Sequence, residues 1–340
     1  MIERILIVGL GSIGKRHVRI LQEIVPNVEI TVLRHKECQD LSVLGIKNCV
    51  TNIIQALKFK PQAAIISNPA SFHIDVATQL AQEHVHLLIE KPISNSTKGV
   101  AELIDICSNN GTVLMTGYNL RFLPSLLKFR SLLRDGFCGS VFSVRAEVGQ
   151  YLPSWRPESD YKKDVSANAT LGGGVLLELS HEIDYMRWLF GEVEWVNAIE
   201  LKQGNLEIDV EDTLHMILGF ENTADKKPIV ATLSMDFIRH DSTRSCTVIA
   251  DRGTLRWNGV DGDIKYFEQG NTDWQLLYEN KNERDSSFTA ELDHFLKCIT
   301  KADKPKITGN DGLVVLKIIE AIRESSSIGS KVYIETKGNI

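Results

Sequence analysis

The sequence predicts an α/β protein whose first half forms a doubly wound parallel sheet and whose second half forms a mostly antiparallel sheet. Up to about residue 117, short apolar runs alternate with amphipathic segments, whereas longer β-type segments separated by polar turns follow residue 140. Alternating strands and helices are typical of parallel crossover units, and consecutive strands joined by turns favour antiparallel pairing. The 340 residues therefore predict two domains, 1–120 and 121–340, with the last helix a candidate to pack back on the first domain.

The first half supplies the parallel strands and the helices between them. Apolar runs predict strands at residues 5–8, 30–33, 63–66, 86–89 and 113–116. Apolar residues at helical spacing predict helices at residues 13–24, 72–83 and 98–109. Because ligands of doubly wound sheets bind at the carboxyl ends of the strands, we expect binding residues directly after these runs.

The second half begins with a helix near residue 123. It continues with expected strands at residues 141–148, 194–201, 213–220, 229–237 and 245–250. Residues 154–170 are polar, contain Pro and Trp and show no period, which predicts a long loop near a site. An amphipathic helix is expected at residues 311–325.

Composition excludes several classes of protein. The 38 Lys and Arg residues against 44 Asp and Glu give a net charge of −6, which argues against nucleic-acid binding. No apolar run has the length of a membrane span, and the first residues lead into a glycine loop instead of a signal peptide, so we expect a soluble, cytoplasmic protein. The six cysteines have no metal-ligand spacing, so we expect no metal site and reduced thiols.

A glycine loop follows the first expected strand. Gly9, Gly11 and Gly14, with Ser12 and Ile13 between them, form a G-x-G-x-x-G pattern that opens a helix. In this context the first glycine permits a tight turn, the second admits a pyrophosphate, and the third allows close packing of helix and strand. The pattern predicts a dinucleotide site, although by itself it also fits a simple turn.

The residue that selects the ribose group is expected about twenty residues beyond the loop. Arg34 stands there, followed by His35 and Lys36. An arginine with a basic neighbour suits a 2′-phosphate, which favours NADP(H). Alternatively, the guanidinium lies on the adenine ring and tolerates either cofactor, so that NAD is also accepted.

Polar residues follow the third and fourth expected strands. Asn68, Pro69 and His73 follow one strand, and Glu90, Lys91 and Pro92 follow the next. A lysine beside a cationic nicotinamide, with its pKa lowered by that charge and by burial, can exchange a proton with a substrate hydroxyl. The alternative for Lys91 is a surface lysine before a turn proline, and for His73 a packing or capping role.

Together these patterns resemble the Gfo/Idh/MocA family of nicotinamide-dependent oxidoreductases, which includes glucose-fructose oxidoreductase and inositol dehydrogenase. The resemblance rests on Gly9-x-Gly11-x-x-Gly14-x-x-His17, Asn68-Pro69-x-x-x-His73, Glu90-Lys91-Pro92, Tyr118-Asn119-x-Arg121-Phe122-x-Pro124 and the segment 172–184, which runs from three glycines to His181 and Asp184. It spans nearly the whole chain.

The resemblance implies a Rossmann domain followed by an α/β domain with a large open sheet, through which such proteins form homodimers or homotetramers. It implies that Lys91 is catalytic with a cis Lys91–Pro92 bond, and that His181 is a second acid/base or orients the hydroxyl. Glu178 stands where the family commonly has aspartate, three residues before His181 instead of four; on one helix both spacings share a face. The expected cofactor contacts are Gly9, Gly11, Ser12, Ile13, Gly14, Arg34, His35, Asn68, Pro69, His73, Glu90 and Lys91.

The segment 150–161 is expected over the substrate cleft. Aromatic faces pack on sugar rings and arginine binds phosphate or carboxylate, so these residues suit a phosphorylated, nucleotide-linked or acidic sugar. The segment also resembles that of family members associated with surface-polysaccharide sugars. The aromatic residues equally suit a subunit contact. For Arg121, the alternative to a substrate contact is an ion pair between the two domains. For Asp184, the alternative is to orient His181. The candidate substrate contacts are Tyr118, Asn119, Arg121, Tyr151, Trp155, Arg156, Tyr161 and Asp184.

The expected activity is hydride transfer between a nicotinamide and a sugar, polyol or nucleotide-sugar carbon, with Lys91, His181 and Glu178 as the catalytic candidates. Three alternatives to this activity remain. The first is a redox-neutral glycosidase that recycles its nicotinamide, and the second is a nicotinamide-sensing regulatory protein without turnover. The third is a protein that keeps only the fold of the family.

Overall fold

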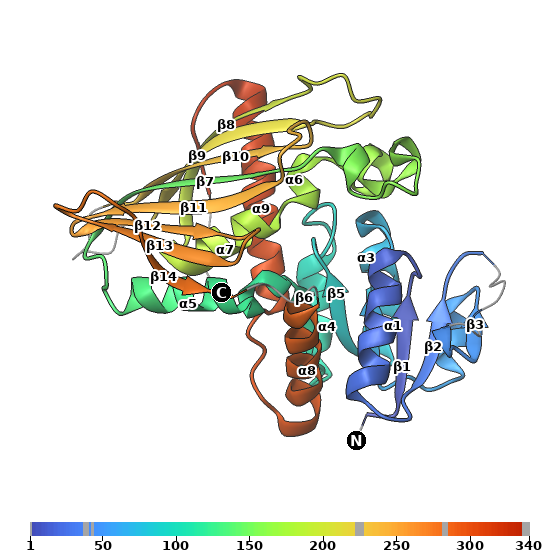
Figure 1. Ribbon diagram of the computed structural model, residues 1–340. Helices are drawn as coiled ribbons and strands as arrows, with labels where there is room; N and C mark the ends of the chain where they lie inside the picture. Colours follow the sequence, from blue (N-terminus) through green and yellow to red (C-terminus); the bar gives the residue numbers. More distant parts are fainter. Residues whose placement is uncertain (1, 37–40, 42–43, 222–227, 281–284, 335–340) are drawn as a thin grey trace. The chain divides into compact units, whose positions relative to one another are not determined.

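The chain divides into two compact units, each built on one sheet (Figure 1). The computed structural model describes residues 2–36, 41, 44–221, 228–280 and 285–334. The first unit comprises Met1–Asn119 and Ser287–Leu316, and the second comprises Leu120–Ser286 and Lys317–Ile340. The expected division of the chain into a dinucleotide-binding domain, 1–120, and a substrate-binding and oligomerisation domain, 121–340, stays a prediction.

The first unit contains a six-stranded sheet in the order β3-β2-β1-β4-β5-β6. All neighbouring strands are parallel, as predicted. The chain moves outward from β1 to β3 and returns to β4 on the other side of β1, so the strand order reverses at the carboxyl end of β1. The strands are β1 (Arg4–Val8), β2 (Glu29–Leu33), β3 (Asn48–Val50), β4 (Ala63–Ile66), β5 (His86–Glu90) and β6 (Leu114–Gly117).

Helices cover the apolar strands of this sheet. Ile5, Leu6 and Ile7 are at most 1% exposed, because a parallel sheet packed on both faces buries every position of its central strands. Helix α8 and the short elements β3 and α2 were not predicted. The helices are α1 (Ser12–Ile24), α2 (Ile53–Leu57), α3 (His73–Gln82), α4 (Val100–Asn109) and α8 (Ser286–Lys301), with the 3₁₀ turns η2 (Ala70–Phe72) and η3 (Asn119–Phe122).

The second unit contains a nine-stranded sheet in the order β14-β13-β12-β11-β7-β10-β9-β8-β15. Its pairs are antiparallel except for β10 with β7, which confirms the mostly antiparallel expectation. Its strands are β7 (Val141–Gly149), β8 (Val193–Leu201), β9 (Thr213–Phe220), β10 (Val230–Asp236), β11 (Thr243–Ala250), β12 (Gly253–Asn258), β13 (Asp263–Glu268), β14 (Gln275–Glu279) and β15 (Val332–Tyr333).

Helices pack on one face of this sheet. The buried Trp257 ring of β12 lies 6.5 Å from Phe129 of helix α5 and 5.5 Å from Tyr185 of helix α7, and its indole N–H donates to Ser125 Oγ at 3.0 Å. The helices are α5 (Pro124–Arg134), α6 (Val175–Glu178), α7 (His181–Phe190) and α9 (Gly309–Ile328). Residues 154–170, expected as a loop, contain the 3₁₀ turns η5 (Tyr161–Lys163), η6 (Val165–Ala167) and η7 (Ala169–Leu171), with η4 (Leu152–Ser154) just before them.

The opposite face of β8, β9 and β10 carries large aliphatic side chains in the open. Their exposed fractions lie between 37% and 55%, although the alternate residues of the same strands are buried against the helices. The exposed residues are Ile199, Leu201, Ile217 and Val230. A face of this kind is suited to contact another protein surface.

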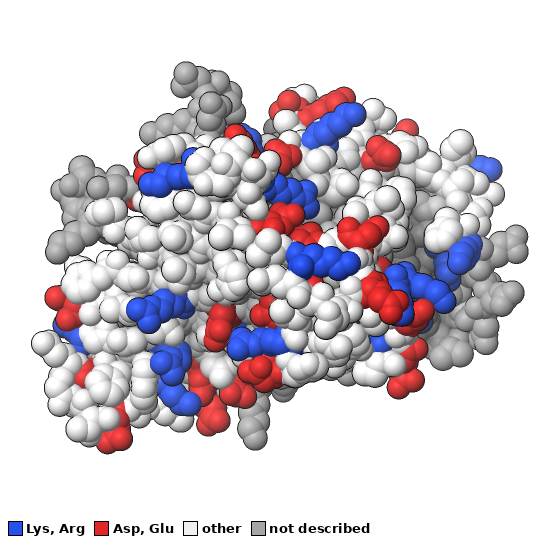
Figure 2. Space-filling view, turned by 90° about the horizontal axis from the view of Figure 1, so that it is seen from above, with Lys and Arg blue, Asp and Glu red and all other residues white. Residues whose placement is uncertain are grey.

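Four of the five cysteines in the described ranges are free thiols. Cys107, Cys138, Cys246 and Cys298 are free and buried, as expected. Cys49 is disulfide-bonded, which corrects the expectation of a reduced thiol at that position, and Cys38 lies outside the described residues. Lys and Arg side chains are interspersed with Asp and Glu over the face in Figure 2. None of the helices within the described ranges is long and apolar enough to cross a membrane.

Candidate functional site

The glycine loop lies at the carboxyl end of β1, where the strand order reverses. Gly9 has φ +87°, and a Cβ placed on it would lie 2.7 Å from the backbone nitrogen of Asn68 after β4. A Cβ on Gly14 would collide with the carbonyl oxygen of Gly9. Gly11, by contrast, has open space around its Cα and precedes the first turn of α1. The loop thus presents the helix N–H groups to an anion, as a dinucleotide pyrophosphate requires.

Arg34 directly follows β2, the strand next to β1. Its backbone N–H donates to Val50 O of β3 at 3.1 Å, and its side chain is half-buried, whereas His35 and Lys36 are exposed. This is the position at which the ribose-selecting residue of such sheets stands.

His73 begins α3 and lies between two loops at the strand ends. It is 1% exposed, with Nε2 2.7 Å from Asn68 O and Nδ1 3.1 Å from Pro92 O. Burial lowers the pKa of His73, although its contact with Asn68 O and the charge of Glu90 oppose the shift. The imidazole therefore links the loops that follow β4 and β5, and its role as a cofactor contact stays a prediction.

The Glu90-Lys91-Pro92 turn follows β5. The Lys91–Pro92 peptide bond is cis, which confirms the expectation from the resemblance. Glu90 is the last residue of β5, and its Oε1 lies 2.6 Å from Nε2 of the buried His17 on α1. Lys91 is half-buried.

Tyr118 and Asn119 are buried residues at the end of the first segment of the first unit. Tyr118 is fully buried, and the Asn119 amide donates to Ser287 Oγ of α8 at 2.8 Å. Both were predicted to contact substrate. This bond uses one of the two N–H donors of the Asn119 amide and leaves its oxygen as an acceptor. The roles of both residues as substrate contacts stay predictions.

In the second unit, the three-glycine segment makes room for neighbouring backbone and for a carboxylate. A Cβ on Gly173 would collide with Val165 O, and a Cβ on Gly174, which has φ +105°, would collide with the Glu211 carboxylate. Glu211 Oε1 accepts a hydrogen bond from Leu176 N in the first turn of α6 at 2.9 Å. The glycines thus fix the path of the chain immediately before Glu178 and His181.

Glu178 and His181 lie on different helices. Glu178 ends α6 and His181 begins α7, and both are half-buried. The expectation that they share one helical face is therefore wrong, because the chain breaks its helical path at Leu179 and Ser180. The catalytic roles of both residues stay predictions.

Arg121 and Asp184 form a buried ion pair within the second unit. Arg121 Nε lies 2.9 Å from Asp184 Oδ2, and Nη2 lies 2.6 Å from Oδ1, with exposed fractions of 6% and 1%. The two-point contact ties η3 to α7, three residues beyond His181. The roles of Arg121 and Asp184 as substrate contacts, and of Asp184 as an orienter of His181, stay predictions.

The predicted substrate loop is held by contacts within the second unit. The Tyr151 ring lies 4.3 Å from His240, and Trp155 lies edge-on to Phe237 at 5.1 Å. Arg156 Nη1 pairs with Asp164 Oδ2 at 3.1 Å, and Tyr161 OH accepts from the backbone N–H of Glu207 at 3.3 Å. These contacts shape the loop, and substrate binding by its residues stays a prediction.

Glu211 is a residue that sequence reasoning missed. It lines a hollow of about 370 Å³ together with Glu200. Burial raises the pKa of Glu211 to about 7, and the charge of Glu200 adds to the rise, whereas the bond from Leu176 N–H opposes it. No local pattern marks Glu211, since its partner Gly174 lies far away in the sequence.

The raised pKa of Glu211 predicts a pH-dependent stability. The Glu211 carboxyl binds its proton more tightly in the folded protein than in the unfolded chain. Its contribution to the free energy of unfolding is therefore fully present below pH 4.5 and is lost as the pH rises through about 7. Glu211→Gln keeps the acceptor for Leu176 N–H and removes the titration. Between pH 4.5 and pH 8, the native protein should lose about 3 kcal/mol of unfolding free energy through this group. Glu211→Gln should not show this loss.

Thermal midpoints between pH 5 and pH 8 check this expectation. Glu207→Gln, which alters a glutamate exposed by 71% in the same unit, is the matched control and should leave the pH slope unchanged. Equal pH slopes for the native protein and Glu211→Gln would refute the shift.

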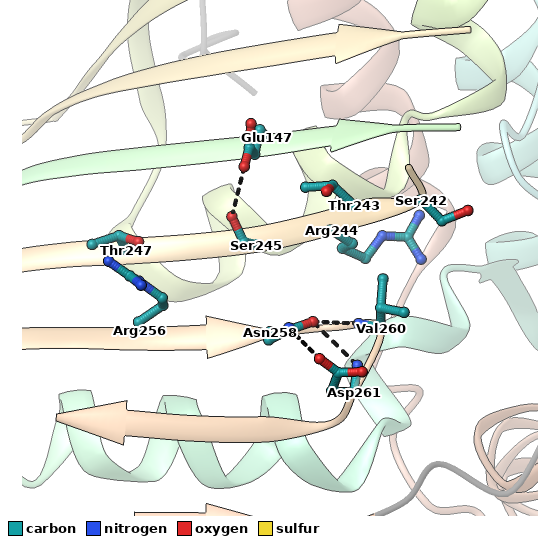
Figure 3. Close-up of a pocket in the computed structure, with 10 residues that line it drawn as sticks. All are labelled: Glu147, Ser242, Thr243, Arg244, Ser245, Thr247, Arg256, Asn258, Val260 and Asp261. Carbon is teal, nitrogen blue, oxygen red and sulfur yellow. Dashed lines mark hydrogen bonds between the residues drawn. The ribbon is translucent and has the colours of Figure 1, made fainter. Parts of the chain in front are cut away.

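A second hollow, of about 530 Å³, lies on the sheet of the second unit, and no predicted site residue lines it (Figure 3). Glu147 of β7 faces Ser245 of β11, and Asn258 of β12 bonds to Asp261 and to the backbone of Val260. Arg244 at its edge donates to the buried Glu182 of α7 at 2.7 Å. No group of three or more His, Cys, Asp or Glu among the described residues is placed to hold a metal ion.

A glycine loop at the switch point of a doubly wound sheet defines the first unit as a dinucleotide-binding domain of the Rossmann class. Comparison with known protein families agrees with this assignment of the first unit. Residues 3–118 match the "Oxidoreductase family, NAD-binding Rossmann fold", and residues 130–334 match the "Oxidoreductase family, C-terminal alpha/beta domain", the two halves of the Gfo/Idh/MocA family. The chain belongs to this family and is an NAD-binding oxidoreductase.

Individual known proteins are similar to this chain along nearly its whole length. The oxidoreductase YrbE of Bacillus subtilis is 25% identical over 97% of this chain and 96% of its own. Myo-inositol 2-dehydrogenase of Thermotoga maritima is 23% identical over 95% of this chain and 96% of its own. The structure of the WlbA dehydrogenase from Bordetella pertussis, in complex with NADH and UDP-GlcNAcA, has a TM-score of 0.81 at 19% identity and covers 99% of this chain and 100% of its own.

Proposed function

We propose that the protein is a dehydrogenase or reductase that transfers a hydride between a nicotinamide and a carbinol or carbonyl carbon of a sugar, polyol or nucleotide sugar. The observation that carries the proposal is the Glu90-Lys91-cis-Pro92 turn, which follows β5 in the same sheet whose β1 leads into the glycine loop. The similarity to a myo-inositol 2-dehydrogenase and to a structure in complex with UDP-GlcNAcA supports the substrate class.

The residues of the first unit fit a dinucleotide. Open space at Gly11 and the N–H groups of α1 suit a pyrophosphate, and the close contacts of Gly9 and Gly14 with their neighbours explain why larger residues do not stand there. When bound, the nicotinamide supplies or accepts the hydride. We assign Lys91 to the cofactor end of the reaction, at the edge of the sheet where the ends of β1, β4 and β5 meet.

Proton transfer falls to side chains of this chain. In the oxidation direction, the substrate C–H bond yields a hydride and its O–H bond yields a proton, and a carbonyl remains. We propose Lys91 as the group that takes this proton and His181 as a second acid/base or an orienter of the hydroxyl. Glu178, three residues before His181, is a further catalytic candidate. A neutral amine and a neutral imidazole can each accept a proton near neutral pH when their surroundings tune their pKa.

For the cofactor, we propose a preference for NADP(H), with NAD accepted. Arg34 is half-buried at the end of β2, with the exposed His35 and Lys36 beside it. Guanidinium groups bind phosphate at two points, which suits a 2′-phosphate. Relative rates with the two cofactors, in the assay below, test this preference.

For assembly, we propose a homodimer or homotetramer through the sheet of the second unit, in the cytoplasm. Support comes from the aliphatic side chains exposed on the open face of β8, β9 and β10. The molar mass in solution, against 38.1 kDa for one chain, tests the assembly, and cell fractionation tests the location.

The experiment for the proposed activity is a substrate panel. Purified protein is mixed with NAD⁺ or NADP⁺ and with free sugars, inositols and nucleotide sugars, and reduced nicotinamide is followed by absorbance. We expect reduction with one substrate class, faster with NADP⁺. Hydrolysis of a glycoside without net reduction would instead identify a nicotinamide-recycling glycosidase. Cofactor binding without turnover in either direction would favour a sensor.

A further inference from the structure

Two buried histidines flank the turn that carries Lys91. His17 of α1 contacts the residue before the lysine, and His73 of α3 contacts the residue after it. We propose that His17 and His73 are positioning residues that hold the Glu90-Lys91-Pro92 turn from both sides and thereby aim the Lys91 amine. The inference rests on the proposed role of Lys91 and adds two residues to it.

The contact on the near side is a buried imidazole–carboxylate pair. His17 is 0% exposed and Glu90 is 12% exposed, with 2.6 Å between Nε2 and Oε1. The His17 ring is itself fixed, because the Phe288 ring of α8 lies edge-on to it at 6.0 Å and the Arg16 guanidinium lies over that phenyl ring. A polar pair in this place costs desolvation free energy that two apolar residues would not, so packing alone does not account for it.

Glu90 is confined from the opposite side as well. A Cβ on Gly117 of β6 would lie 3.2 Å from both the Glu90 Cα and its Oε2. Any side chain at position 117 would therefore press on Glu90, and glycine leaves the carboxylate where His17 reaches it. The residue directly before Lys91 is thus fixed at its backbone by β5 and at its side chain by α1.

The contact on the far side runs through the backbone. His73 lies between two carbonyl oxygens, Asn68 O at 2.7 Å from Nε2 and Pro92 O at 3.1 Å from Nδ1. Carbonyl oxygens only accept, and a neutral imidazole has one N–H, so the proton on the ring selects which carbonyl is held at a given moment. The imidazole bridges the loops after β4 and β5, and the loop after β5 begins with Lys91.

The position of the Lys91 amine depends on how firmly the residues beside Lys91 are held. A lysine side chain has four rotatable bonds, so the place of its amine depends on where its backbone begins and on what surrounds it. A reacting group displaced by about 1 Å loses on the order of a hundredfold in rate. Loosening either neighbour of Lys91 should therefore reduce turnover more than cofactor affinity.

Pairs of variants separate positioning from packing. His17→Gln keeps a donor near the place of Nε2, and His17→Leu removes it. His73→Asn keeps a donor near the place of Nδ1, toward Pro92 O, and His73→Gln keeps one near Nε2, toward Asn68 O. His294→Gln is the matched control, because His294 is a buried histidine of the same unit whose Nε2 accepts the Lys306 N–H.

Three quantities are measured for each variant: kcat, cofactor affinity by titration, and the thermal midpoint. A fourth is the labelling rate of Lys91 by an amine reagent without added cofactor, quantified by peptide mass spectrometry. We expect kcat to fall about tenfold to a hundredfold in His17→Leu and His73→Gln. We expect it to stay near the native value in His17→Gln, His73→Asn and His294→Gln. The labelling rate should change in the first two variants only.

Unchanged kcat and labelling in folded His17→Leu and His73→Gln would overturn the inference. So would a larger loss of kcat in His73→Asn than in His73→Gln, since His73 would then act through Asn68. If His17→Leu does not fold, the two His73 variants decide. Lys91→Ala with native turnover would refute the proposed role of Lys91, whereas the labelling rates report positioning whether or not that role holds.

Discussion

Lys91→Ala is expected to reduce kcat by about 10² to 10⁴ while cofactor affinity stays within a small factor of the native value. The loss corresponds to about 2.7–5.4 kcal/mol of activation free energy. The physical reason is that the amine handles the hydroxyl proton during the chemical step, whereas the dinucleotide is held by the glycine loop and the first turn of α1. Steady-state kinetics and a cofactor titration on the same protein check both parts.

Two further variants make this result specific. Lys98→Ala removes an exposed lysine of the same unit and should leave kcat unchanged. Lys91→Arg keeps a positive charge, but a guanidinium cannot take up a proton, so we expect it to be as inactive as Lys91→Ala. Substantial activity in Lys91→Arg would mean that the lysine acts by its charge alone. Native turnover in Lys91→Ala would remove it from the mechanism.

The parallel sheet could be predicted closely because its strands are continuous apolar runs. The expected strand 63–66 is the observed β4, and α1 begins one residue before its expected start. The short elements β3 and α2, with three and five residues, give no measurable period. In the second unit, β12 and β13 were missed because each has six residues with only two buried apolar positions, so the alternation of apolar and polar residues is short.

The site was predictable where its residues are close in sequence. Gly9 to Gly14 and the Glu90-Lys91-Pro92 turn are local patterns, and the structure places both at carboxyl ends of strands of one sheet. The buried position of Glu211 was not predictable, because the carboxylate lies against Gly174, which only the tertiary fold brings near. The shared helical face of Glu178 and His181 was wrong because spacing alone does not reveal the break between α6 and α7.

Asp184→Asn is expected to destabilise the second unit by about 3–5 kcal/mol. The substitution leaves the Arg121 guanidinium, 6% exposed, without the carboxylate that it contacts at two points. For a unit of this size the loss lowers the thermal midpoint by about 6–20 °C. Calorimetry or circular dichroism of the variant and the native protein measures the shift.

The same substitution at an exposed pair is the control. Asp241 pairs with Arg239 at 3.3 Å but is 78% exposed, so Asp241→Asn should change stability by about 0–1 kcal/mol. Replacing both buried partners, as Arg121→Met with Asp184→Leu, should recover much of the lost stability, because no uncompensated charge remains. If this double variant is stable but turns over slowly, the ion pair serves to hold the start of α7, and His181 with it. A single Asp184→Asn variant as stable as the control would show that the pair does not anchor the helix.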